Sequence, residues 1–219
     1  MALTGVEKLP TVKVEAQTLY HGTIVPRQEY IHPPVRDAKF GNGAYFTDNF
    51  DIAKAYATLK RDAGEELVIQ GDEPRATVCN VAVSGMFLDL RKGYGPLAEF
   101  LCTNGEAFLA LFDKLVAERE SGQSRTIWEV EGITFAERRM NLECVFRVLE
   151  KGDINPRKFE SEMLDILPIF LSQCGISGRI DSAAEIFFKN GDLVLQDLTQ
   201  WVVFNPGDAK VVKEISVEP

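Results

Sequence analysis

The segment FGNGAYFTDNFDIAKAYA, residues 40–57, constrains the fold more than any other stretch of this chain. It opens with a Gly-X-Gly turn, Gly41 to Gly43, shortly before Tyr45. Glycine adopts positive φ without a Cβ penalty, so the chain can turn sharply there onto a strand that carries Tyr45. A short amphipathic run follows and carries Tyr56. We therefore expect a strand, a cap and a helix that bring the two phenol rings towards each other across a cleft.

The helix of this segment has its own start signal. Asp48 or Asn49 is placed to cap its first turn, because short polar side chains accept hydrogen bonds from the first amides of a helix. Its apolar face is predicted to hold Phe50, Ala53 and Tyr56 or Ala57. Two tyrosines beside a glycine turn are often ordinary packing residues. Such a pair can also clamp a flat, electron-poor ring between its aromatic faces.

Length and composition are typical of one soluble domain. The 219 residues are 45% hydrophobic, which suffices for one substantial core, and no repeat or low-complexity tail interrupts residues 1–219. The sequence shows no apolar run of membrane-spanning length and no signal-peptide pattern in MALTGVEKLP, so we expect a cytoplasmic protein with no membrane partner. The net charge of −9 disfavours a sequence-independent nucleic-acid binder, because such proteins need a basic surface.

Cysteine and histidine usage disfavours a metal site. The two histidines, His21 and His32, belong to no HExxH motif, and the cysteines form no CxxC pair. We therefore expect no bound metal. Buried free thiols are expected at Cys79, Cys102, Cys144 and Cys174.

Apolar periodicity divides the chain into an outer β part and a helical middle. Strands, one of them kinked at Gly85, are predicted at 17–20, 76–83, 86–90, 176–180, 185–189, 201–204 and 211–217. Helices, the last one interrupted by Pro168, are predicted over 106–119, 135–149 and 157–173. The Pro-rich stretch 24–39 is predicted to be a loop. This order predicts an α+β fold with a helical insertion at roughly 100–173.

Three motifs occur in the order LYHGT (19–23), GNGAYFTDNFDIAKAY (41–56) and TQWVVFNPGDAKVV (199–212). Together they resemble the His-Gly-Ser/Thr strand, the Gly-X-Gly-X-Tyr-Phe segment and the last strand of the ADP-ribosyltransferase superfamily, in its diphtheria-toxin and poly(ADP-ribose)-polymerase-like branch with a His-Tyr-Glu triad. The ending from residue 175 onwards is also similar to ADP-ribosyltransferase domains of phage and bacterial conflict proteins. The resemblance implies a single ADP-ribosyltransferase-like domain over residues 1–219, with a split antiparallel β-sheet as its core.

The resemblance also implies a site for NAD, used as a co-substrate. By this likeness Tyr45 and Tyr56 would stack the nicotinamide ring, and Gly22 backbone groups would bind its carboxamide. His21 would bind the adenosine-side ribose, with help from Thr23. Breaking the bond between nicotinamide and ribose passes through an oxocarbenium-like state, so the enzyme must hold the ring and stabilise positive charge. Outside this context His21 would be interpreted as a hydrogen-bonded histidine at a strand end.

Two positions depart from the family pattern. Gln200 stands where the most active members carry a glutamate, and it completes an implied catalytic set with His21 and Tyr45. Glutamine keeps the hydrogen bonding and loses the charge and the general-base option, which argues against polymer formation. Ala53 stands where relatives often carry a serine that contacts the carboxamide.

Several roles stay open at this point. Asp197 or Glu185 could supply the carboxylate that position 200 lacks. Arg36 and Lys39 either pair with the NAD pyrophosphate or are solvated loop charges. Gln200 itself either binds the ribose or faces solvent at the start of a strand.

The resemblance implies an NAD-dependent mono-ADP-ribosyltransferase that acts as a toxin or modifier in phage–bacterium conflict. Its acceptor would be a protein side chain or a base of RNA or DNA, and an antitoxin or inhibitory partner would neutralise it. Two alternatives are an NAD glycohydrolase, which passes the ribosyl group to water, and a catalytically inactive module that binds NAD or a macromolecule. A third, an RNA 2′-phosphotransferase, would need further arginines and a histidine in the core motifs.

Overall fold

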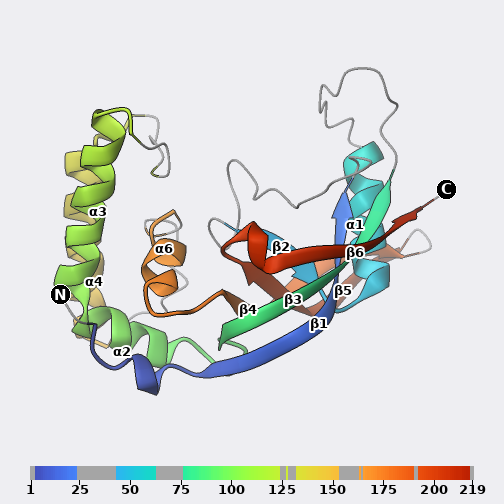
Figure 1. Ribbon diagram of the computed structural model, residues 1–219, viewed down its shortest axis with the longest axis horizontal. Helices are drawn as coiled ribbons and strands as arrows, with labels where there is room; N and C mark the ends of the chain where they lie inside the picture. The colour runs from blue at the N-terminus through green and yellow to red at the C-terminus, as the bar shows by residue number, and fades with distance from the viewer. Residues whose placement is uncertain are drawn as a thin grey trace. The chain divides into compact units, whose positions relative to one another are not determined.

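The computed structural model describes residues 3–23, 43–62, 76–123, 127, 132–152, 163, 165–189 and 192–217, with the backbone alone at 60–62, 183–189, 192–197 and 206. These parts form a mixed α+β fold, which confirms the predicted class (Figure 1). The strands are β1 (Thr11–Thr23), β2 (Ala44–Thr47), β3 (Thr77–Asp89), β4 (Gly178–Lys189), β5 (Asp192–Val203) and β6 (Ala209–Ser216). The helices are α1 (Phe50–Asp62), α2 (Gly95–Thr103), α3 (Gly105–Glu120), α4 (Phe135–Glu150) and α6 (Leu167–Ser172), with 3-10 turns η1 (Val6–Lys8) and η3 (Pro206–Asp208).

The described residues form two compact units. The helical unit contains residues 3–11, 92–123, 127, 132–152, 163 and 165–176, and holds α2, α3, α4 and α6. The sheet unit contains residues 12–23, 43–62, 76–91, 177–189 and 192–217, and holds α1 and the strands. The predicted helical insertion, roughly 100–173, falls within the helical unit. That residues 1–219 make one domain stays a prediction.

The strands of the sheet unit form one connected sheet in the order β1-β2-β5-β4-β3-β6. β1 also pairs with β3, so the first five strands of this order close into a ring, and β6 extends it from β3. Antiparallel pairs dominate, but β3 and β4 run parallel where 87–89 meet 178–180. The predicted split antiparallel sheet is therefore corrected. β1 is long enough to reach both β2 and β3, which joins the strands into one closed sheet.

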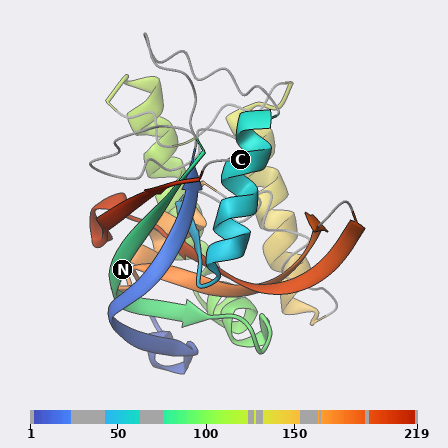
Figure 2. The same ribbon diagram turned by 90° about the vertical axis from the view of Figure 1, so that its right-hand side faces the viewer.

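Apolar side chains from all the strands pack together in one cluster of the sheet unit. The ring of Trp201 meets the ring of Phe87 edge-on at 5.4 Å. Small closed sheets are filled by such inward side chains, which alternate with outward ones along each strand. Outside this core, Ala53 and Ala57 of α1 pack with Val78, and Figure 2 shows α1 in cyan beside β1 in blue. The main core includes Leu19, Phe46, Val81, Phe87, Ile180, Trp201, Val203 and Ala209.

Gly85 marks the point where β3 changes its partner. β3 pairs with β6 over 77–83 and with β4 over 87–89. Gly85 has a φ of 143°, and a Cβ there would overlap the Ser177 side chain. Only glycine combines that backbone angle with so little space. As predicted, the strand continues past an irregular position at Gly85.

Other strands extend further than apolar periodicity predicts. β1 runs over Thr11–Thr23, and the two strands predicted at 176–180 and 185–189 are one strand, β4. β4 and β5 pair continuously from Gly178 with Val203 to Lys189 with Asp192. Backbone amides and carbonyls make this ladder, so pairing continues past the apolar residues that the pattern detects.

The core of the helical unit is built on phenylalanine rings. Phe108 of α3 contacts Phe146 of α4 at 5.6 Å and Phe170 of α6 at 5.0 Å between ring centroids. Phe100 of α2 meets Phe170 at 6.0 Å. The predicted helices over 106–119 and 135–149 are confirmed as α3 and α4. In the described parts of the chain, no helix is long and apolar enough to span a bilayer.

The boundaries of two helices differ from the prediction. α2 was not expected, although its buried Leu97, Phe100 and Leu101 follow helical spacing after Pro96 in the first turn. Pro168 also lies in a first turn, that of α6, where a missing amide costs nothing. Pro168 therefore starts α6, and residues 157–162 and 164 of the predicted helix lie outside the described residues.

One buried ion pair fixes α4 within the helical unit. Arg138 donates to both carboxylate oxygens of Asp165, at 2.9 and 3.2 Å, and the two side chains are 4% and 3% exposed. The guanidinium also lies over the ring of Phe112, 5.6 Å from its centroid. Bidentate pairs of this kind are directional, so the contact fixes the rotation of α4 as well as its distance.

We predict that Asp165→Ala lowers the free energy of unfolding by about 3–5 kcal/mol, because it leaves the Arg138 charge buried without this carboxylate. Asp113→Ala serves as the control. Its carboxylate binds Arg139 at 2.8 Å but is 49% exposed, so its loss should cost about 1 kcal/mol or less. Urea denaturation followed by circular dichroism measures both variants. Equal losses would contradict the prediction.

The four cysteines are free thiols, as expected, but their burial differs. Cys79 is buried, whereas Cys144 is exposed, which corrects the expectation of four buried thiols. Cys144 faces outwards because its neighbours Leu142 and Val145 occupy the buried face of α4. Desolvation, with a smaller contribution from the Glu214 carboxylate, raises the pKa of Cys79 to about 11.

We predict that a small alkylating reagent at pH 8 modifies Cys144 of the native protein much faster than Cys79. The thiolate is the reactive form, and a pKa of about 11 leaves on the order of one Cys79 thiol in a thousand ionised at that pH. Peptide mass spectrometry measures the two rates, and a urea-unfolded sample, in which both thiols react, is the control. Equal rates in the native protein would show that the prediction is wrong.

Candidate functional site

The corner between β2 and α1 is held by side-chain hydrogen bonds. Thr47 Oγ1 accepts from the amide of Asn49 at 3.1 Å. Asn49 Oδ1 in turn accepts from the amides of Asp51 and Ile52, at 3.0 and 3.3 Å. Asn49 rather than Asp48 therefore caps α1, and the predicted cap is confirmed. The cap fixes the direction in which α1 leaves the strand.

Gly22 lies where the backbone of β1 meets the backbone of α1. A Cβ on Gly22 would overlap the carbonyl oxygen of Ala53 and lie 2.9 Å from the amide nitrogen of Ala57. Ala53 is 1% exposed and Ala57 is fully buried. A strand and a helix approach this closely only where one of them lacks a side chain. Packing against α1 therefore requires glycine at this position, whatever else its peptide groups bind.

His21 links β1 to β2. The two strands share the register pair Tyr20 with Thr47, and one residue further along β1 the His21 Nδ1 lies 2.7 Å from the carbonyl oxygen of Tyr45. The half-buried imidazole also packs against Phe46, with ring centroids 5.7 Å apart. A carbonyl oxygen only accepts, so Nδ1 carries the proton, and in the neutral ring the lone pair is then on Nε2.

The ladder between β2 and β5 places Tyr45 beside Gln200. Tyr45 pairs with Val202, and Thr47 pairs with Gln200. Residues directly opposite each other in an antiparallel pair point to the same side, as do alternate residues of one strand. Tyr45 and Gln200 are therefore diagonal neighbours on one side of the sheet, within reach of each other for long side chains.

The two sides of the sheet carry different candidate residues. Phe46 and Trp201 belong to the apolar core, so Tyr45 and Gln200 point to the opposite side. The His21 ring lies against Phe46, on the core side of β2. The structure thus joins His21 to Tyr45 through the backbone carbonyl. It does not place the His21 ring and the Gln200 amide on the same side of the sheet.

The remaining candidates of the sheet unit lie on β1 and α1. Thr23 ends β1 and is 4% exposed. Tyr56 lies one turn after Ala53 in α1 and, like Tyr45, is half-buried. Ala53 is packed against Gly22 and offers no side-chain donor. That the two tyrosine rings face each other across a cleft stays a prediction.

The amide of Gln200 has an unmet acceptor. Its Oε1 is buried and has no hydrogen-bond partner among the residues that the structure describes. A buried acceptor without a donor costs about 1–3 kcal/mol. An atom in this state is suited to receive a hydrogen bond from a hydroxyl group of a ligand.

Sequence reasoning missed the carboxylate that lies opposite Gln200. Asp181 of β4 is the register partner of Gln200, and its side chain is fully buried. Arg179, two residues earlier on the same side of the strand, donates its Nε hydrogen to Asp181 at 2.6 Å. The segment GRIDS does contain a signal, because two opposite charges alternate with apolar residues in a strand. Nothing local, however, indicates which residue of another strand they would meet.

Four predicted residues receive no side-chain description. Arg36 and Lys39 lie outside the described residues. The backbones of Glu185 and Asp197 lie in β4 and β5, and their side chains are outside the described part. Their predicted roles stay predictions. Across the described ranges, no group of three or more His, Cys, Asp and Glu side chains could hold a metal ion.

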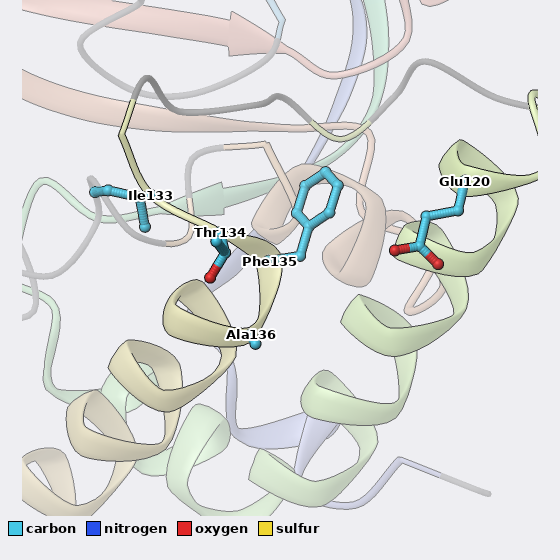
Figure 3. A pocket seen from close by; sticks show the side chains of 5 residues that line it. All are labelled: Glu120, Ile133, Thr134, Phe135 and Ala136. Atoms are coloured by element: carbon cyan, nitrogen blue, oxygen red, sulfur yellow. The ribbon is translucent and has the colours of Figure 1, made fainter.

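The helical unit has a surface pocket of about 390 Å³, shown in Figure 3. Its wall is formed by Glu120, Ile133, Thr134, Phe135 and Ala136. The Thr134 hydroxyl is already used, because it accepts from the amide of Glu137 and donates to its carboxylate in the capping box of α4. Among its described lining residues, the pocket therefore offers one carboxylate and no second group for chemistry, and we assign it no reaction.

Comparison with known proteins adds little to this site. No family model and no curated protein sequence matches the chain. Among solved structures, the chain is similar to the one described as the crystal structure of the M. tuberculosis MbcT-MbcA toxin-antitoxin complex, with 12% sequence identity and a TM-score of 0.34. The match covers 99% of this chain and 92% of that chain. A likeness at this level carries no argument, so the site is argued from its own residues.

We predict that Gly22→Ala destabilises the protein by about 1–3 kcal/mol, because the new methyl group overlaps the Ala53 carbonyl and forces the strand away from α1. The control is Gly95→Ala at the start of α2, where a new Cβ has nothing within 4 Å and where alanine favours the helix. Urea unfolding measures both variants. If Gly22→Ala were as stable as Gly95→Ala, the close packing of β1 on α1 would be refuted.

Proposed function

We propose that this protein is an NAD-dependent mono-ADP-ribosyltransferase that acts in the cytoplasm as a toxin or modifier in phage–bacterium conflict. Its acceptor is a protein side chain or a base of RNA or DNA. An antitoxin or inhibitory partner would neutralise it in the cell that makes it. The motifs around His21, Tyr45 and Gln200 support this proposal, together with the position of these residues on three paired strands.

The observation that carries the proposal is the unmet acceptor of Gln200. Its buried Oε1 lies on the same side of the sheet as Tyr45. The nicotinamide-side ribose of NAD offers hydroxyl donors, and one of them would satisfy this oxygen. Because a buried polar atom is costly until it is paired, the amide favours a bound sugar over an apolar ligand.

His21 has the tautomer that the proposal requires. With Nδ1 donating to the Tyr45 carbonyl, the neutral ring has its acceptor at Nε2, which can receive a hydrogen bond from a hydroxyl of the adenosine-side ribose. The same bond holds the backbone of Tyr45. Since the ring lies on the core side of β2, we assign His21 a positioning role for Tyr45 in addition to any contact with ribose.

The remaining residues define how NAD would be held and what reaction they support. Gly22 backbone groups would bind the carboxamide, and Tyr45 and Tyr56 would hold the nicotinamide ring. The C–N bond between nicotinamide and ribose breaks, nicotinamide leaves, and the acceptor attacks the ribose carbon. Gln200 brings hydrogen bonding without charge, so it cannot act as a general base. This limits the reaction to single transfers onto an acceptor that is already nucleophilic.

Ala53 and Gln200 favour one second candidate, a module that binds NAD without turning it over. Ala53 is buried against Gly22 and supplies no hydroxyl for the carboxamide. Loss of that donor, combined with loss of the glutamate charge, removes two stabilising groups from the reaction. Both candidates bind NAD, so turnover alone separates them.

We predict that purified protein incubated with NAD labelled in the adenylate part transfers label to macromolecules of a bacterial extract. Tyr45→Ala and His21→Ala should lower this labelling on the order of a hundred-fold, because each removes a contact that holds the reacting group. Met140→Ala, whose side chain is 58% exposed on α4, is the matched control and should label as the wild type does. Expression of the wild type should also be toxic, and Tyr45→Ala should relieve the toxicity.

Digestion of the labelled extract identifies the acceptor. Release of label by protease and not by nuclease indicates a protein acceptor, and the reverse indicates nucleic acid. Free ADP-ribose without any labelled macromolecule would replace the transferase by an NAD glycohydrolase. Equal labelling by the wild type and both site variants would discard the enzyme hypothesis, and NAD binding without turnover would favour the inactive module.

A further inference from the structure

The β4–β5 ladder places a carboxylate directly opposite Gln200. Asp181 and Gln200 are register partners in an antiparallel pair, so their side chains lie on the same side, with Cβ atoms about 4.5–5.5 Å apart. Thr47 continues this row on β2. The row runs across three strands on the side of the sheet that also carries Tyr45.

Asp181 is held as a buried ion pair. Its side chain has no exposed surface, that of Arg179 is 2% exposed, and the Nε of Arg179 lies 2.6 Å from Oδ2 of Asp181. A buried carboxylate keeps its charge only with such a partner. Burying two charges is expensive, and apolar residues of the same volume often stabilise a fold equally well. Stability of the closed sheet alone therefore does not account for the pair.

The hydrogen-bonding groups of the Gln200 amide offer an explanation for a carboxylate at position 181. A carboxylate accepts hydrogen bonds and donates none, so only the NH₂ end of an amide can face it favourably. An amide that faces a carboxylate with its Nε2 turns its Oε1 away from it. Oε1 is also the atom that is buried without a partner among the described residues. A carboxylate opposite the amide thus favours the orientation that leaves Oε1 for a ligand.

We infer that Asp181, held by Arg179, is a positioning residue that orients the Gln200 amide towards the ribose. This inference rests on the proposed function. Asp181 is fully buried, so it acts through Gln200 and does not touch the substrate. The same arrangement explains why position 200 is an amide. A glutamate there would place two carboxylates opposite each other, and like charges directly opposite destabilise a sheet.

The experiment exchanges the acid and the amide between the two strands. The variants are Asp181→Asn, Gln200→Glu and the double variant Asp181→Asn/Gln200→Glu, with Asp89→Asn as the control. Asp89 is also paired, with Arg91 at 2.6 Å, but lies at the end of β3 outside the row. For each variant, kcat and KM for NAD consumption are measured across pH, and the midpoint of unfolding is measured in urea.

We expect each single variant to lower kcat about ten-fold or more with little change in KM, because the amide is misoriented or faces a like charge while NAD still binds. The double variant should recover kcat to within about three-fold of the wild type, since it restores one acid and one amide across the ladder. The kcat of the double variant should also fall at low pH, unlike that of the wild type. The new carboxylate at position 200 works only when ionised, so activity is lost as pH falls through the pKa of that carboxylate. A purely structural pair would not move the pH profile.

Two results would overturn the inference. One is an Asp181→Asn variant that keeps the kcat of the wild type, and the other is a double variant no more active than the worse single variant. If the wild type itself consumes no NAD, the proposed function fails, and the urea midpoints still decide whether Asp181 and Gln200 are coupled. If the shift of the urea midpoint in the double variant equals the sum of the shifts in the two single variants, coupling between Asp181 and Gln200 is excluded. A double variant whose midpoint lies closer to that of the wild type than this sum would support coupling.

Discussion

The register of β2 against β5 is the constraint on which the candidate site depends. Phe46 pairs with Trp201, and both rings are buried in the core of the sheet unit. A slip of one residue would turn these rings outwards and every alternate side chain inwards, so burial of the two rings fixes the register strongly. Tyr45 and Gln200 then share the opposite side without any contact of their own being needed. Apolar burial on one face thus determines the polar geometry on the other.

Features that act within a few residues were predictable from sequence, and those that depend on strand pairing were not. Asn49 indicates the start of α1, and Gly85 indicates the irregular position of β3, because each signal is local. The family resemblance implies a ligand-binding role for Gly22, whereas its contact with the backbone of Ala53 exists only in the folded chain. Asp181 gives no local sign of its relation to Gln200, since the register decides which residues meet. The closed ring depends likewise on pairing between β1 and β3.

Among the described residues, each unit contains one buried Arg–Asp pair, and the two pairs differ in their surroundings. Arg138 and Asp165 join two segments of the helical unit through a bidentate contact, and the guanidinium lies over the Phe112 ring. Arg179 and Asp181 come from a single strand, so their contact joins no separate elements. A pair within one strand adds little to tertiary cohesion, because its partners are already held together by the backbone. What it does add is fixed charge on one side of the sheet, next to an uncharged amide.

The closed arrangement of strands also affects how the molecule meets copies of itself. β1 pairs with both β2 and β3, so within the described residues the order of strands ends at β6. Lys210, Lys213 and Glu214 are exposed along that strand. Charged side chains on a terminal strand oppose the addition of a strand from a second chain. These charges therefore disfavour edge-to-edge aggregation at β6. An open sheet of the same strands would have two such edges.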